Sequence, residues 1–99
     1  MMLTVLEAQV APENEAKLQA AYDAAASTPL PPGLLHSQLL HDARDATRWR
    51  IQTWWASRPA LDAMRQQGTP AGVLMFRAAG AEPSLSVFEV TGEIPSPHS

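Results

Sequence analysis

The sequence predicts one α+β domain of the ferredoxin-like class, in which an antiparallel four-stranded sheet carries helices on one face. Three observations support this prediction. Strand-like and helix-like segments follow one another in the order β-α-β-β-α(α)-β. The length of 99 residues fits one hydrophobic core, and the apolar content of 45% is ordinary for a globular protein. Residues 1–92 form the predicted domain, and residues 93–99 are predicted to be a flexible C-terminal tail.

The first half of the chain supplies a strand, a helix and a hairpin. Leu3–Val10 is a predicted strand with apolar side chains on both faces. Pro12 then begins a helix, because proline lacks the N–H that the first helical turn leaves unpaired. The proline-rich segment Ser27–Pro32 ends that helix. Two strands follow, Leu34–His41 and Thr47–Trp55, and the second is rich in residues that sheets favour.

The second half supplies two short helices and a last strand. Ser57 has the side chain of a helix cap and precedes the first of these helices. Thr69 and Pro70 repeat that pattern as a cap residue followed by proline, and Gly80 ends the third helix. Residues 84–91 alternate as a strand. Helices in this order can cover only one face of the sheet.

The register of the hairpin decides which of its side chains share a face. A polar turn at residues 42–46 joins the two strands, and its length is ambiguous by one residue. We favour the register in which Asp42 pairs with Thr47. That register places His36 and Gln38 on one face with Ile51, Thr53 and Trp55. A slip of one residue would exchange the faces.

The face without helices is predicted to meet a second copy of the protein. All four strands carry apolar side chains on both faces, and Trp54 and Trp55 point in opposite directions. A contiguous apolar face usually marks an interface, and a two-fold homodimer buries it economically. The predicted dimer face includes Arg48, Arg50 and Trp54. The alternative is a monomer with scattered apolar surface residues.

Composition excludes several other classes of partner. The net charge of −3 disfavours binding to nucleic acid and to anionic lipid. Without cysteine the chain has neither disulfides nor cysteine metal sites, and His36 and His41 project to opposite faces of one strand. We therefore predict no metal site. The N-terminus lacks the cationic start of a signal peptide and no segment could span a bilayer, so we predict a soluble cytoplasmic protein without membrane contact.

The hairpin and the helix that follows it resemble a known family. The run PGLLHSQLLHD, a short acidic turn and the run RWRIQTWWASRPALDAM are similar to the antibiotic biosynthesis monooxygenase (ABM) domain. The positions that fit its pattern are Pro32, Gly33, Trp55, Ser57, Ala60, Leu61 and Ala63, together with Pro12 and the segment Ala81–Val90. The resemblance covers Leu3–Val90. It implies a homodimeric α+β barrel with a ligand pocket between the sheet and the helices of each subunit.

The resemblance implies oxygenation without a cofactor rather than haem breakdown. Haem-degrading relatives use an asparagine in the first strand and a histidine in the later helices. This chain has Glu7 and Gln9 in the first strand but no asparagine, and residues 57–80 contain no histidine. Cofactor-free members of the family oxidise a small aromatic or quinol-type metabolite, with the substrate as its own electron source. Two alternatives stay open: a non-catalytic dimer that binds a small ligand or serves as an interaction module, and a non-oxidative isomerase or cyclase.

Such an oxygenation needs a base, a hydrogen-bond donor and an aromatic wall. His36 is the candidate base because histidine titrates near neutral pH. Gln38 and Arg77 are candidate donors. The candidate wall consists of Tyr22, Trp49, Trp55 and Phe76.

Each of these assignments has a purely structural alternative. His36 could be a strand histidine bonded to a backbone group or water. Trp55 could be a core residue that anchors the second helix. Tyr22 could lie on the helix surface.

Overall fold

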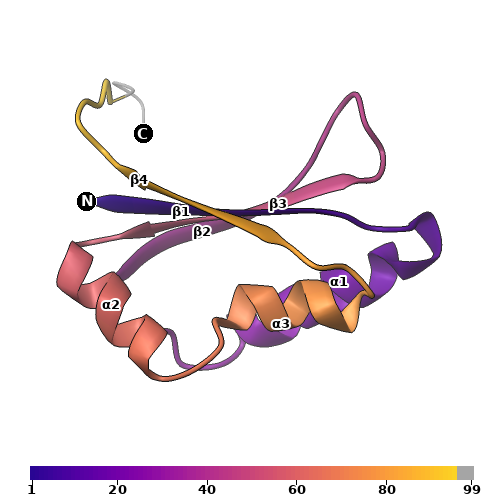
Figure 1. Cartoon of the computed structure of the whole chain (residues 1–99), viewed down its shortest axis with the longest axis horizontal. Helices are drawn as coiled ribbons and strands as arrows, with labels where there is room; N and C mark the ends of the chain where they lie inside the picture. Colours follow the sequence, from indigo (N-terminus) through magenta and orange to yellow (C-terminus); the bar gives the residue numbers. More distant parts are fainter. Residues whose placement is uncertain (96–99) are drawn as a thin grey trace.

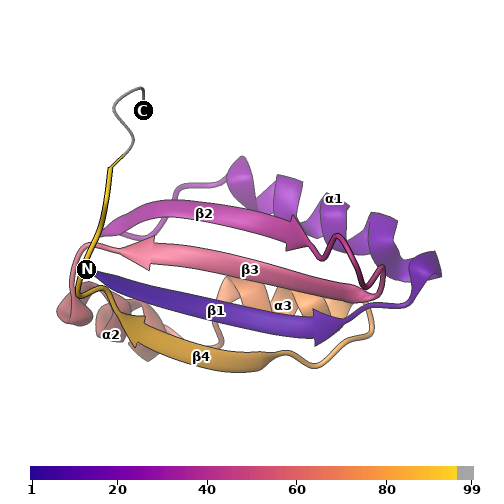
Figure 2. The ribbon, with the colours of Figure 1, turned by 90° about the horizontal axis from the view of Figure 1, so that it is seen from above.

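Four antiparallel strands form one sheet, and all helices lie on one side of it (Figure 1). The structure is a computed structural model that describes residues 1–95, so residues 96–99 of the predicted tail lie outside it. The elements are β1 (Met2–Gln9), a 3₁₀ turn (Pro12–Asn14), α1 (Glu15–Ala26), β2 (Leu34–His41), β3 (Arg48–Trp55), α2 (Arg58–Gln66), α3 (Ala71–Ala78) and β4 (Ser84–Glu89). The strand order is β2-β3-β1-β4 (Figure 2). The predicted ferredoxin-like class is confirmed.

The predicted helix starts are confirmed in two of three cases. Pro12 opens the 3₁₀ turn that leads into α1. Ser57 caps α2, because its side chain accepts a hydrogen bond of 3.2 Å from the Ala60 N–H. The predicted cap of α3 by Thr69 is wrong: Pro70, with an extended ψ of 143°, occupies the N-cap position. Because proline φ already matches the helix, α3 begins without a side-chain cap.

The favoured hairpin register is wrong by one residue. Asp42 pairs with Arg48 through a hydrogen bond of 3.0 Å rather than with Thr47. Ser37 therefore lies opposite Thr53, on the face that carries the helices. His36 and Gln38 lie on the other face.

Local hydrogen bonds in the acidic turn explain the longer loop. Asp42 Oδ1 accepts from the N–H groups of Arg44 (2.7 Å) and Asp45 (3.0 Å), and Asp45 Oδ1 accepts from the hydroxyl and the N–H of Thr47. The N–H of Arg44, followed by that of Asp45, lowers the pKa of the Asp42 carboxyl. The Thr47 hydroxyl, followed by its N–H, lowers the pKa of Asp45. Short acidic side chains form such turns readily, and this one adds a residue to the loop.

The core lies between the sheet and the helices. Leu18 of α1, Phe76 of α3 and Leu61 of α2 are at most 1% exposed and face buried side chains of β1 and β3. Gly72 explains how closely α3 approaches the sheet. A Cβ atom at Gly72 would lie 2.6 Å from Leu6 Cδ1, so a larger residue there would require the Leu6 side chain or α3 to shift.

The open face of the sheet carries one apolar row across all four strands. Phe88 of β4 pairs with Leu3 of β1, which pairs with Trp54 of β3, which pairs with His36 of β2. We call these four residues the outer row. The His36 and Trp54 rings are 5.3 Å apart, and Phe88 is 51% exposed. Figure 2 shows this face without a covering element.

The rest of the open face combines polar and apolar side chains. Arg48, Arg50 and Trp54 do share this face, as predicted. Arg50 forms an ion pair of 2.7 Å with Glu7 of β1, so its charge is locally compensated. Outside the outer row this face carries the apolar residues Val5 of β1 and Leu40 of β2, beside polar residues such as Gln52 and Ser86. No helix within residues 1–95 is long and apolar enough to cross a membrane.

Candidate functional site

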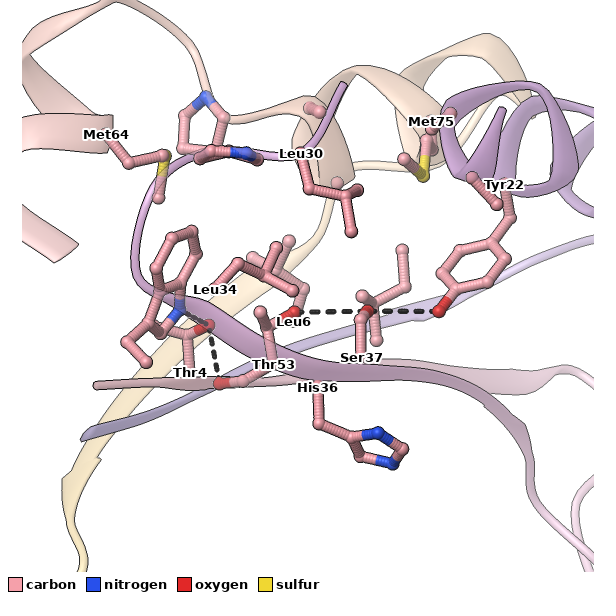
Figure 3. A pocket seen from close by; sticks show the side chains of 18 of the residues that line it. Thr4, Leu6, Tyr22, Leu30, Leu34, His36, Ser37, Thr53, Met64 and Met75 are labelled. Carbon is pink, nitrogen blue, oxygen red and sulfur yellow. Dashed lines mark hydrogen bonds between the residues drawn. The ribbon is translucent and has the colours of Figure 1, made fainter. Parts of the chain in front are cut away.

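A cavity of about 520 Å³ opens between the helix-bearing face of the sheet and the helices (Figure 3). Its floor is formed by β1, β2 and β3, and its walls by α1, the loop before β2, α2 and the first half of α3. The side chains that line it include those of Thr4, Leu6, Tyr22, Leu30, Ser37, Thr53, Trp55, Met64 and Met75. A cavity of this size is typical of sites for small organic molecules.

The cavity lining is uncharged. Within residues 1–95 no Asp, Glu, Lys or Arg borders the cavity. Apart from the hydroxyl-bearing residues and His36, whose imidazole points away, the lining consists of glycine, alanine, leucine, isoleucine, proline, methionine and tryptophan. Such a lining favours an apolar ligand and penalises a charged one, because an ion would lose its hydration without gaining a partner.

Three hydroxyl groups form a hydrogen-bonded chain across the cavity floor (Figure 3). The Tyr22 hydroxyl of α1 donates to Ser37 Oγ of β2 over 3.0 Å. Ser37 Oγ is 3.3 Å from Thr53 Oγ1 of β3, and either of these two can donate. The one-residue difference in register creates this chain, because it turns Ser37 toward the helices.

Trp55 closes one end of the cavity in a fixed orientation. It is 3% exposed, and its Nε1–H donates to Thr4 Oγ1 over 3.2 Å. Thr4 donates in turn to the Thr53 carbonyl at 3.5 Å. Met2 and Leu61 pack against the ring. Trp55 thus both borders the cavity and anchors α2, so the two roles considered for it are compatible.

His36 borders the cavity, but the structure does not point its imidazole into it. His36 belongs to the strand that forms the cavity floor, but its imidazole points away, toward the open face (Figure 3). Gln38 lies on that same open face, opposite Gln52. The predicted geometry of both residues is wrong because it depended on the register.

Arg77, Trp49 and Phe76 also lie outside the cavity lining. Arg77 is exposed and forms an ion pair with Glu82, which lowers the pKa of that carboxyl. Trp49 is a core residue whose ring stacks on His41 with centroids 4.0 Å apart. Phe76 is completely buried in the same core. Tyr22 and Trp55 are the two predicted wall residues that line the cavity.

The sequence interpretation missed the hydroxyl groups of Thr4, Ser37 and Thr53. One signal was available: Thr4 and Thr53 lie at inward positions of strands whose other inward residues are apolar. A polar residue at such a position is informative because burial is costly without a hydrogen-bond partner. Among residues 1–95, no three His, Asp or Glu side chains gather as a group that could hold a metal ion.

The sequence matches the ABM family. The family described as "Antibiotic biosynthesis monooxygenase" matches residues 1–69, which is more than half of the chain. The protein therefore belongs to this family, and the predicted resemblance is confirmed. A monooxygenase-like role in general follows from the family. A comparison with curated proteins gives no significant match.

Several solved structures share the fold over nearly their whole length. A protein from Deinococcus radiodurans assigned as an antibiotic biosynthesis monooxygenase is 16% identical, with a TM-score of 0.74, over 97% of this chain and 98% of that chain. SnoaB, a cofactor-independent oxygenase from Streptomyces nogalater, is also 16% identical, with a TM-score of 0.71 over 96% and 97%. A variant of MhuD with two manganese protoporphyrin IX molecules per active site is 20% identical, with a TM-score of 0.72 over 97% and 100%. At these identities the likeness shows the fold.

Proposed function

We propose that this protein is a cofactor-independent monooxygenase that acts on a small aromatic or quinol-type molecule in the cavity between sheet and helices. The observation that carries the proposal is the uncharged cavity with a chain of hydroxyl groups on its floor. Its apolar walls suit an aromatic ring system, and its hydroxyl groups suit a phenolic or carbonyl oxygen. The family match supports the reaction type.

In the proposed reaction the substrate supplies the electrons. Its electron-rich anion reduces O₂, one oxygen atom enters the substrate and the other leaves as water. The protein excludes bulk water, and the one hydroxyl hydrogen that the chain leaves free, on Ser37 or Thr53, donates a hydrogen bond to the oxyanion of the substrate. Among the described residues, Tyr22 is the only titratable residue whose side chain points into the cavity. No histidine or carboxylate side chain is therefore positioned to act as the base. The proposal therefore requires a substrate acidic enough to lose its proton to water.

The same observation favours a second candidate, a ligand-binding protein without turnover. A neutral cavity without a histidine or carboxylate side chain can bind an aromatic molecule but offers little for proton transfer. The two candidates share the cavity and differ in oxygen consumption. Trp55 lines the cavity, so its fluorescence should report binding in either case.

Oxygen uptake with a naphthohydroquinone distinguishes the two candidates. The monooxygenase predicts protein-dependent O₂ uptake above the spontaneous oxidation of the quinol. Ala25 lines the cavity and its neighbour Ala24 does not, so Ala25→Phe is expected to abolish this uptake and Ala24→Phe to preserve it. Binding seen by tryptophan fluorescence without O₂ uptake would favour the second candidate. Absence of binding would contradict both.

The outer row supports a further part of the proposal, a homodimer formed through the open face. Phe88, Leu3 and Trp54 lie side by side on the uncovered face, and burying the same row from two copies would remove this apolar surface from water. The ion pair between Arg50 and Glu7 beside the row neutralises its own charges, so it does not oppose association.

Trp54→Glu is expected to convert the proposed dimer into a monomer, because it places a charge in the middle of the outer row. Sedimentation velocity at micromolar concentration measures the change. Gln66→Glu adds the same charge at an exposed position of α2 and should leave the dimer intact. A wild-type protein that sediments as a monomer would contradict the dimer.

A further inference from the structure

The hydroxyl chain on the cavity floor carries one more hydrogen than it uses. Tyr22, Ser37 and Thr53 have three hydroxyl hydrogens, and the two hydrogen bonds of the chain use two of them. The Tyr22 hydrogen goes to Ser37 Oγ. Whichever way the bond between Ser37 and Thr53 points, the third hydrogen belongs to one of these two residues and has no acceptor among residues 1–95. The floor therefore presents a hydrogen-bond donor to the cavity.

The other end of the chain presents an acceptor. Tyr22 Oη donates its hydrogen to Ser37 and accepts no hydrogen bond from residues 1–95, so its lone pairs are available. Tyr22 Oη, the acceptor, lies 3.0 Å from Ser37 Oγ, which lies 3.3 Å from Thr53 Oγ1. The acceptor and the free donor, on Ser37 or Thr53, are therefore close to each other. A single hydroxyl group, or a carbonyl and a hydroxyl on one ring system, can engage them.

Charge sets the second condition on the ligand. The described lining contains no arginine or lysine, and the imidazole of His36 points to the other side of the sheet. A carboxylate in this cavity would have one spare hydrogen-bond donor to replace its whole hydration shell. Burying an ion with so few hydrogen-bond partners and no opposite charge is strongly unfavourable.

We infer that the Tyr22–Ser37–Thr53 chain selects an uncharged ligand with a phenolic hydroxyl or a carbonyl oxygen, and that the cavity rejects carboxylates. The inference rests on the proposed function, since it names the ligand class of the same cavity. It also assigns specificity to residues whose side chains carry no charge.

Three naphthalene derivatives of nearly equal size test the inference on the intact protein. Naphthalene measures the apolar cavity alone, naphthol adds a hydroxyl group and naphthoate adds a carboxylate. Titration calorimetry and the quenching of tryptophan fluorescence measure the dissociation constants. Naphthol is expected to bind about fivefold more tightly than naphthalene, which corresponds to one net hydrogen bond. Naphthoate is expected to bind more weakly than naphthalene.

Substitutions in the chain locate the selectivity. Thr53→Val removes one hydroxyl group with little change in shape, and Ser37→Ala removes another. Each single variant still leaves a free hydroxyl hydrogen in the cavity, on Ser37 in the first and on Tyr22 and Thr53 in the second, so each should keep a preference for naphthol. The triple variant Tyr22→Phe/Ser37→Ala/Thr53→Val removes all three hydroxyl groups and should bring the affinity for naphthol down to that for naphthalene. Thr53→Ser keeps the hydroxyl group and should keep the preference for naphthol. Ser86→Ala, on the open face of β4, is the matched control and should behave as wild type.

The possible outcomes separate this inference from the proposed function. Equal affinities for naphthalene and naphthol in the wild type would overturn the inference, and quinol-dependent O₂ uptake would still stand. Tight binding of naphthoate would also overturn it. A preference for naphthol that survives in the triple variant Tyr22→Phe/Ser37→Ala/Thr53→Val would remove the hydroxyl chain from the explanation. If none of the three compounds binds, the inference fails together with the proposed function.

Discussion

Phe76→Ala is expected to lower the free energy of unfolding by about 3–5 kcal/mol, the usual cost of removing a buried phenylalanine ring. Phe76 is completely buried between α3, α1 and the sheet, where it packs in the same core as Leu18 and Trp49. The substitution leaves a void that the surrounding helices can fill only in part. Urea unfolding followed by far-UV circular dichroism measures the loss as a lower midpoint at an unchanged slope.

Met75→Ala is the matched comparison from the same helix. Met75 is partly buried and lines the existing cavity, so truncating it enlarges that cavity instead of creating a new one. The expected loss of stability is about 1 kcal/mol, together with altered binding of aromatic ligands. Equal losses for the two variants would contradict the assignment of Phe76 to the core and Met75 to the cavity wall.

Gly33→Ala is expected to lower the free energy of unfolding by about 2–5 kcal/mol, through two separate costs. Gly33 has a φ of +84°, which is unfavourable for any residue with a Cβ. The added Cβ would also lie 2.5 Å from the Cβ of Ala60 in α2, at the junction where the Gly33 carbonyl accepts a hydrogen bond from Ala56. The methyl group of Ala60 has no flexible end that could move aside, so α2 or the start of β2 must shift.

Two further variants separate these costs in the same urea assay. Gly68 has a φ of +123°, and a Cβ added there would meet nothing within 4 Å, so Gly68→Ala should show the conformational cost alone. Ala60→Gly should destabilise the wild type by about 1 kcal/mol through helix propensity. In the Gly33→Ala background the same change should restore stability by relieving the contact. Additive effects of Gly33→Ala and Ala60→Gly would contradict the contact.

Much of the fold could be predicted from local patterns. The strand Leu34–His41 and the capping side chain of Ser57 are set by residue types within a few positions, and both predictions agree with the structure. The hairpin register could not be predicted in this way. It depends on whether Asp42 and Asp45 form hydrogen bonds inside the turn. Both possible registers place a similar mixture of apolar and polar residues on each face of the hairpin.

The candidate site was less predictable than the fold because it depends on that register. Moving the pairing by one residue turns His36 toward the open face and turns Ser37 toward Tyr22. The sequence does not distinguish the aromatic residues Trp49, Trp55 and Phe76 from one another, but of these three only Trp55 borders the cavity. Packing decides this, since an aromatic ring fills a core and lines a pocket through the same apolar surface.

The sequence by itself determined the family, the order of strands and helices, and the presence of apolar side chains on the open face. These properties follow from residue types at local or periodic spacing, so they can be inferred without coordinates. The tertiary structure alone decided that the cavity is uncharged and that hydroxyl groups, not a histidine, are its polar groups. The physical reason is that side chains from α1, β2 and β3 meet there, and their meeting depends on a register that the acidic turn sets from outside the cavity.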